Sequence, residues 1–248
     1  GRLIEVDDRV LHTWHAVLED DDVPVRRTRM LYTVNRAVSH VLARIAEAER
    51  IGSLDLELSR GWDESIDRKK GRFVSRWGAP ESWDDVILQG PHLFVSTPLY
   101  KTPNPTMKHN QDWSETDFEA LSPDAIPATS YKPAGDRYEY DIAYTDWGTD
   151  VHPLPARDYY RIAYRRMAAN TGERTLIPAL IPPGAAHVNA VFSTTSASLE
   201  PTTLIRTLAA LSSLTADFNI RAAPKGDIYP GAVERLPLPR ADHVLAGA

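Results

Sequence analysis

The first third of the chain carries the spacing of amphipathic helices. Residues 8–18 place apolar side chains on one face, and residues 27–50 repeat that spacing at three- and four-residue steps over a much longer stretch. Both patterns predict helices. The longer one predicts a single continuous helix whose buried face holds Leu31, Val34, Val38, Val41 and Ile45.

Further along, the pattern changes to short alternating or apolar runs. These predict strands at 54–58, 91–100, 137–145, 158–165, 174–181 and 187–194. A polar loop with several prolines is predicted at 101–113, a basic hairpin or loop at 67–72, a second helix at 201–218, and a strand or extended tail at 228–239.

Proline supports this division of the chain. Of the 19 prolines only Pro24 precedes residue 80, and proline breaks helices and avoids central strands. We therefore expect an α+β fold, with a helical N-terminal part over 1–79. A mixed, mostly antiparallel sheet with long ordered loops and a C-terminal helix should follow over 80–248, as a second part or as one continuous domain.

Composition narrows the class of protein. With 42% hydrophobic residues in 248, the chain can bury a sizeable core, and the lack of Cys excludes disulfides and thiolate chemistry. No apolar run approaches the ~20 residues that cross a bilayer, and no apolar leader precedes residue 8, so a cytoplasmic protein is expected. Because the chain opens on Gly1 without Met, we interpret it as a segment of a longer protein.

Charge is distributed unevenly. The net charge of −6 is not typical of a strongly basic nucleic-acid binder, and residues 1–24 are the acidic part. Two windows are locally basic: residues 60–76 carry six Arg or Lys and three acids, and residues 157–174 carry five Arg and two acids. Each window is either a solvated face or a binding surface.

Familiar catalytic motifs are missing. The sequence has no phosphate-binding glycine loop and no Gly-x-Ser-x-Gly elbow, and its eight His do not fall at metal-ligand spacing. Asp84 and Asp85 are expected at a helix N-terminus, and the acidic run at 20–22 in a solvated loop. No catalytic or metal-binding residue is therefore predicted.

The most distinctive segment is residues 160–177, read Tyr-Arg-Ile-Ala-Tyr-Arg-Arg-Met-Ala-Ala-Asn-Thr-Gly-Glu-Arg-Thr-Leu-Ile, continuing to Pro178, Pro182, Pro183 and His187. It resembles the C-terminal specificity regions of large fused, type IIG-like restriction-modification adenine methyltransferases and their relatives in the BREX and DISARM phage-defence systems. Residues 211–221 and the Leu-Pro-Leu-Pro ending at 236–239 are similar to the end of such regions, and residues 83–101 match more weakly.

The resemblance implies a DNA target-recognition domain without its catalytic domain. Neither the (Asn/Asp)-Pro-Pro-(Tyr/Phe) motif nor the glycine-rich S-adenosylmethionine motif of the family occurs here. The chain itself is then no enzyme and binds no cofactor. The parent chain would be a site-specific adenine-N6 DNA methyltransferase that uses S-adenosylmethionine, with or without a fused endonuclease. Its partners would be double-stranded DNA and the methyltransferase domain of the same chain, and no membrane.

For a DNA reader, the chemistry requires cations for phosphates and amide or guanidinium groups for bases. The basic run at 68–72, the loop at 101–111 and the opening of the predicted strand at 174 offer such groups. The predicted DNA-binding residues are Arg68, Lys69, Lys70, Arg72, Lys101, Asn104, Lys108, Asn110, Arg174 and Thr175. Alternatively, Arg174 pairs with a carboxylate such as Glu173 or Asp158 and fixes a loop.

Two other functions remain open from the sequence alone. The acidic N-terminus and the long helix would suit a protein-interaction module, which an exposed apolar stripe on the 27–50 helix would favour. A metal-dependent hydrolase would need three carboxylates close to one point, because a hard cation takes several oxygen ligands.

Overall fold

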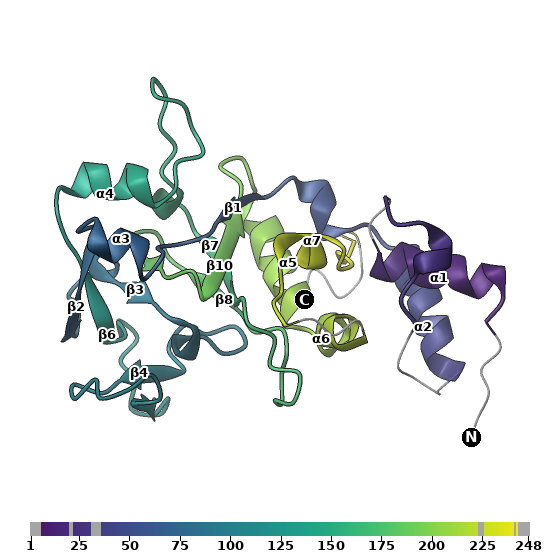
Figure 1. Ribbon diagram of the computed structural model, residues 1–248, viewed down its shortest axis with the longest axis horizontal. Helices are drawn as coiled ribbons and strands as arrows, with labels where there is room; N and C mark the ends of the chain where they lie inside the picture. Colours follow the sequence, from purple (N-terminus) through teal and green to yellow (C-terminus); the bar gives the residue numbers. More distant parts are fainter. Residues whose placement is uncertain (1–5, 20–21, 31–35, 223–225, 241, 243–248) are drawn as a thin grey trace. The chain divides into compact units, whose positions relative to one another are not determined.

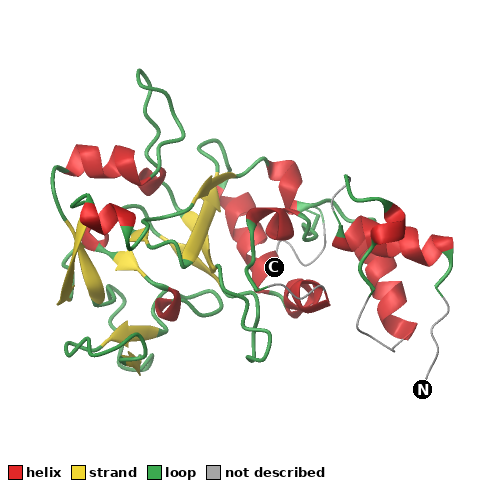
Figure 2. Ribbon diagram, in the orientation of Figure 1, coloured by secondary structure: helices red, strands yellow, loops and turns green. Residues whose placement is uncertain are grey.

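The computed structural model describes residues 6–19, 22–30, 36–222, 226–240 and 242. The chain folds into two compact units, each built from stretches far apart in sequence. Unit 1 comprises residues 1–55, 168–176 and 205–248, and unit 2 comprises residues 56–167 and 177–204. The predicted α+β fold is confirmed, with helices toward both ends of the chain and mostly antiparallel strands between (Figures 1 and 2). The predicted division between residues 79 and 80 falls inside unit 2.

Unit 2 is centred on a four-stranded antiparallel sheet in the order β1-β10-β7-β8. Its strands are β1 (Glu57–Ser59), β10 (Val191–Thr195), β7 (Arg161–Arg165) and β8 (Pro178–Ile181). The strands predicted at 158–165, 174–181 and 187–194 are thus confirmed with shorter bounds. The first four residues of β7 are fully buried, so this central strand is covered on both faces.

Three two-stranded pairs complete unit 2. Their strands are β2 (Phe73–Gly78) with β6 (Thr129–Pro133), β3 (Ile87–Leu88) with β9 (Ala186–His187), and β4 (Lys101–Pro103) with β5 (Trp113–Glu115). The β3–β9 pair is parallel, and the others are antiparallel. Trp62, Phe73, Tyr140 and Tyr144 form an aromatic core in which Trp62 Nε1 donates to the Tyr140 hydroxyl at 2.8 Å.

The strand predicted at 137–145 is wrong, because α4 (Arg137–Tyr144) is a helix. The Asp136 side chain accepts the N–H of Glu139 at 3.0 Å and caps the first turn. Tyr140 and Tyr144 lie four residues apart and both are buried, which is helical spacing, whereas Tyr138 is exposed. The predicted strand at 91–100 is also wrong. That segment holds only the end of the 3-10 helix η4 (Gly90–His92) and isolated bridges.

Unit 1 pairs α1 (Asp8–Leu18), as predicted, with α2 (Arg36–Ala46). The continuous helix predicted over 27–50 is wrong. The 3-10 helix η1 (Val25–Arg27) is followed by Thr28, whose ψ angle of 134° is not helical, and the Glu19 carboxylate then accepts the N–H of Arg29 at 2.8 Å. These contacts hold residues 28–30 outside any helix. The 3-10 helix η2 (Ile51–Leu54) follows α2.

The buried face predicted for that helix is only partly tested. Ile45 is buried, as predicted, together with Leu42, in a cluster with Trp14, Val17 and Leu18 of α1. Val41 is 47% exposed, so its predicted burial is wrong. Leu31 and Val34 lie outside the described residues, as does the side chain of Val38.

The helix predicted at 201–218 is divided into α5 (Pro201–Ser212) and α6 (Leu214–Ala222). Ser213 ends the first and caps the second, because its Oγ accepts the N–H of Ala216 at 3.1 Å. The tail predicted as a strand or extended segment contains a short helix, α7 (Pro230–Glu234), with proline in its first turn.

Two fully buried histidines should make stability depend on pH. Burial is the main cause that lowers the pKa of His92 to about 4 and that of His187 to about 3. The unfolded chain protonates both near pH 6.5, whereas the folded protein leaves them neutral, so protons favour the unfolded state as the pH falls.

We expect the free energy of unfolding to fall from pH 7 to pH 5, by on the order of 1 kcal/mol per pH unit for each histidine below pH 6.5. Chemical denaturation at both pH values measures it. A His187→Gln variant should lose less stability over the same interval. Equal unfolding free energies at pH 7 and pH 5 would contradict the burial of neutral histidines.

Candidate nucleic-acid interface

The densest run of positive charge in unit 2 lies on α3 (Ile66–Lys69) and the first part of β2. Residues 68–76 hold five cationic side chains and no carboxylate: Arg68, Lys69, Lys70, Arg72 and Arg76. All are exposed except the half-buried Arg72. The loop predicted at 67–72 is partly wrong, because this run begins in one helical turn that Lys70 caps. We call residues 68–76 the cationic segment.

The carboxylates that precede the cationic segment are engaged in local contacts. Asp63 Oδ1 accepts two backbone N–H groups of the next turn, at 2.7 and 2.8 Å, and these bonds lower the pKa of its carboxyl group. Glu64 Oε1 accepts the Tyr131 hydroxyl at 2.6 Å. Asp67 Oδ1 lies 3.8 Å from Lys70 Nζ. These three carboxylates therefore stabilise the local structure around α3.

The cations themselves are weakly paired. The Arg72 guanidinium lies 3.7 Å from the exposed carboxylate of Glu139. In the part of the chain that the structure describes, Lys69 and Arg76 form no ion pair. Exposed pairs contribute only ~0–1 kcal/mol, so these side chains are available to an anionic ligand such as a phosphate backbone.

The segment predicted as a loop at 101–113 includes most of a β-hairpin. Strands β4 and β5 pair antiparallel, with Thr102 opposite Ser114, and residues 104–112 form the connection. Lys101 Nζ lies 3.2 Å from Glu115 Oε1, directly across the strand pair. Lys101 therefore has a protein partner, whereas the exposed Lys108 and Asn110 lie in the connection.

Asp112 holds this connection in one conformation. Its Oδ1 accepts from Asn104 Nδ2 at 2.9 Å, and its Oδ2 accepts from Thr106 Oγ1 at 2.5 Å and from the Lys108 N–H at 3.0 Å. These hydrogen bonds, that of Thr106 first, lower the pKa of Asp112 to about 2. Asn104 Oδ1 also accepts from the Ser114 hydroxyl at 2.7 Å. The Asn104 amide is thus used within the hairpin, which argues against its predicted role in reading bases.

Replacing Asp112 with alanine should loosen the hairpin without unfolding unit 2, because Asp112 is only half-buried and its side-chain partners all lie within residues 104–108. We expect faster amide hydrogen exchange at Lys108, measured by NMR, with an unchanged midpoint of thermal unfolding. An Asp117→Ala variant, in the segment after β5, is the control. Unchanged exchange at Lys108 in the Asp112 variant would contradict this assignment.

The cationic segment and the hairpin belong to neighbouring elements. Trp77 Nε1, on β2, donates to the carbonyl oxygen of Pro103, on β4, at 2.8 Å. Strand β2 also pairs with β6, which contacts β4. Within unit 2, Figure 1 shows α3, β2, β6 and β4 together at one end. Strand β2 thus connects the two predicted stretches: residues 68–72 precede one end of it, and the hairpin of 101–111 contacts it near the other end.

Arg174 and Thr175 instead form hydrogen bonds within unit 1. Thr175 is fully buried, and its N–H donates to Asp217 Oδ1 at 2.7 Å. Arg174 donates to the carbonyl oxygens of Ser212 and Ser213, and its Nε lies 3.6 Å from Asp217 Oδ1. A buried side chain cannot touch DNA, so the predicted contact by Thr175 is wrong. Arg174 has the loop-fixing role that the sequence left open, with Asp217 as its carboxylate rather than Glu173 or Asp158.

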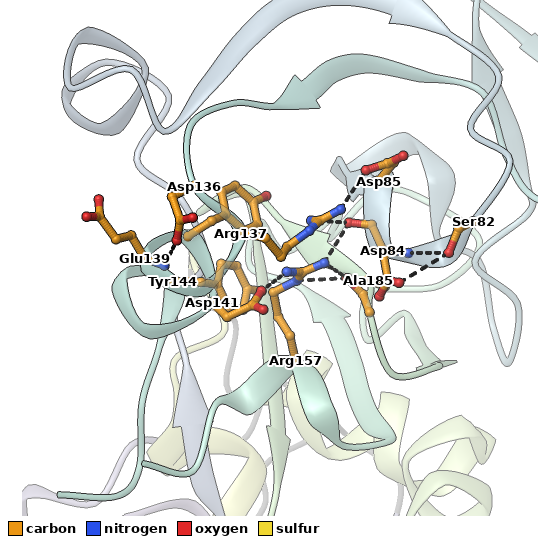
Figure 3. A network of polar contacts seen from close by, with 12 residues as sticks. Ser82, Asp84, Asp85, Asp136, Arg137, Glu139, Asp141, Tyr144, Arg157 and Ala185 are labelled. Carbon is orange, nitrogen blue, oxygen red and sulfur yellow. Dashed lines mark hydrogen bonds and ion pairs between the residues drawn. The ribbon is translucent and has the colours of Figure 1, made fainter. Parts of the chain in front are cut away.

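A polar network on unit 2 was missed from the sequence. The backbone carbonyl of Asp84, in the 3-10 helix η3 (Trp83–Asp85), accepts from Arg137 Nη1 at 2.8 Å and from Arg157 Nη2 at 2.6 Å (Figure 3). Arg137 also pairs with Asp85 at 2.7 Å, and the buried Arg157, in the 3-10 helix η5 (Ala156–Asp158), pairs with Asp141. The network ties η3 to α4 and η5. In the sequence, only the paired acids at 84–85 and the arginine-rich window at 157–174 indicated this network.

An open cleft of about 600 Å³ beside this network is acidic. Four carboxylates line it against the single cation Arg157, namely those of Glu81, Asp84, Asp141 and Asp158. Burial and then the neighbouring Asp141 and Asp84 raise the pKa of Asp158. The negative charge of this cleft would repel phosphate, so we do not include the cleft in the candidate interface.

The described residues include no group of three or more His, Asp or Glu side chains placed to hold a metal ion. The hydrolase alternative therefore has no metal centre in that part of the chain. None of the helices there combines the length and apolar character that crossing a lipid bilayer requires. Comparison of the sequence with protein-family models and with curated proteins finds no match.

Proposed function

We propose that this chain is the DNA sequence-recognition part of an adenine DNA methyltransferase of a restriction-modification or phage-defence system. The observation that supports it most is the cationic segment, with available cations, connected through Trp77 of β2 to a hairpin whose tip carries exposed polar side chains. Phosphate contacts provide affinity and position, and base contacts provide sequence preference. The two elements together offer both kinds of group.

The methyltransferase part of the proposal rests on the sequence resemblance. The catalytic and cofactor motifs of that family do not occur in these 248 residues. The parent chain would therefore supply S-adenosylmethionine binding and the adenine-N6 transfer, and it would form the second side of a clamp around the duplex. With few phosphate contacts of its own, the isolated chain should bind DNA weakly at physiological salt.

The protein-interaction alternative is less well supported. It would need an apolar stripe left exposed on the N-terminal helix. In the described part of α2, Leu42 and Ile45 are buried and Val41 is exposed. Met30, which precedes α2, is also exposed. Scattered exposed apolar side chains are ordinary on a protein surface, so the described residues of 27–50 give this alternative little support.

Selection from a pool of randomised 30-base-pair duplexes tests the proposal. The immobilised 248-residue chain should retain duplexes at low salt and enrich a common sequence over successive rounds. A single-stranded pool of the same length is the control. Failure to retain duplex DNA at low salt would contradict the proposed function. The protein-interaction hypothesis would then be favoured.

A further inference from the structure

We propose that the β4–β5 hairpin is the base-reading element, that it enters the major groove, and that Asn110 and Gln111 at its tip recognise adenine. This inference rests on the proposed function and deepens it. It assigns the groove, the base and the reading residues, and it removes Asn104 from that role.

The hairpin has a suitable shape for the groove. It is a narrow two-stranded ribbon with a nine-residue connection over 104–112. The major groove of B-DNA is ~12 Å wide and admits such a ribbon, whereas the minor groove is about half as wide. The Asp112 contacts keep the connection ordered before binding, which reduces the conformational entropy lost on association.

The inner polar groups of the connection are already paired. Asn104, Thr106 and Ser114 form a hydrogen-bonded set around Asp112. The four polar side chains over 108–111 are all exposed: Lys108, His109, Asn110 and Gln111. The side-chain amides of Asn110 and Gln111 have no protein partner among the described residues. The hairpin therefore divides its polar residues into an inner set that fixes shape and an outer set that is free to bind.

The outer set matches adenine chemically. A side-chain amide carries one acceptor and one donor group, and the major-groove edge of adenine offers the N6 amino donor and the N7 acceptor. The stretch 104–111 contains no carboxylate that would accept from the N4 amino group of cytosine. Lys108 adds a cation for a nearby phosphate or for guanine.

The experiment combines variants with altered DNA. Duplex selection is run with the unchanged 248-residue chain, with the Asn110→Ala/Gln111→Ala double variant, and with Lys69→Ala as a control on the cationic segment. The unchanged chain and the Lys69 variant should enrich the same sequence, the latter with lower affinity. The double variant should keep duplex binding but lose preference for adenine at one or two positions, by roughly 10- to 100-fold each.

The second arm replaces adenine by 7-deazaadenine, which lacks the N7 acceptor, at those positions of the selected duplex. The unchanged chain should lose affinity for this duplex by a similar factor. The double variant should bind the adenine and 7-deazaadenine duplexes with equal affinity. Circular dichroism confirms that each variant is folded. If the double variant enriched the same adenines, or if 7-deazaadenine left the affinity unchanged, the hairpin assignment would be wrong even though DNA binding stood. If the unchanged chain retained no duplex, the proposed function itself would fail.

Discussion

Replacing Asp217 with alanine should lower the free energy of unfolding of unit 1 by about 3–5 kcal/mol. This carboxylate is almost fully buried and accepts the N–H groups of Thr175 and Leu176 at 2.7 and 2.8 Å. It also pairs with Arg221 at 2.8 Å and lies 3.6 Å from the guanidinium of Arg174. The substitution leaves the two buried N–H groups without an acceptor and removes the carboxylate that neutralises the nearly buried guanidinium of Arg174, and each change is costly.

Chemical denaturation monitored by circular dichroism measures the effect. Glu47→Ala is the matched control, because Glu47 pairs with Arg44 in an exposed ion pair of the same unit. That variant should change the unfolding free energy by less than ~1 kcal/mol. A loss below ~1 kcal/mol for Asp217→Ala would show that the loop at 172–176 is held by other contacts.

The second large effect concerns DNA. Replacing Arg68, Lys69 and Lys70 together with alanine should weaken binding to all duplexes alike, by roughly tenfold or more at low salt, because phosphate contacts carry no sequence information. All three side chains are exposed, so the fold should be unaffected. Fluorescence anisotropy with labelled duplexes of several sequences measures the change.

The matched control removes three exposed cations from unit 1: Arg26, Arg27 and Arg44. It lowers the net charge by the same amount but should leave binding nearly unchanged. If both triple variants lost the same affinity, the effect would come from net charge and not from a defined surface. If the first variant changed sequence preference instead, the cationic segment would be reading bases.

The sequence predicted the fold class because its two main signals are physical constraints. Proline excludes long helices over most of the chain, and alternation marks partly buried strands such as β1. The errors arose where a local contact decided the structure. Asp136 caps α4 and turns an alternating segment into a helix, and Ser213 divides the C-terminal helix. In a sequence, a single capping residue is a weaker predictor of secondary structure than the spacing of hydrophobic residues.

The candidate site was only partly predictable. The segment that carries the resemblance is buried near both of its ends, where Arg161 is fully buried and Thr175 binds Asp217, whereas its middle is more exposed. Packing restricts interior residues, so a recognisable pattern there describes the fold rather than the ligand contacts. Exposed cations at 68–70 were found from composition alone. Asp112 binds the side chain of Asn104 but not that of Asn110. This difference between the two amides depends on contacts that only the folded hairpin shows.

The salt dependence of duplex binding shows whether the cationic segment contacts DNA phosphates. The observed association constant of the 248-residue chain for a duplex of random sequence is measured from 50 to 200 mM salt, with and without alanine at Arg68, Lys69 and Lys70. Each phosphate contact contributes ~0.9 to the slope of log K against log salt concentration. We expect a slope steeper than about −2.7 that becomes shallower by about 2.7 in the triple variant. A slope near zero in the unchanged chain, or the same slope in both proteins, would contradict this expectation.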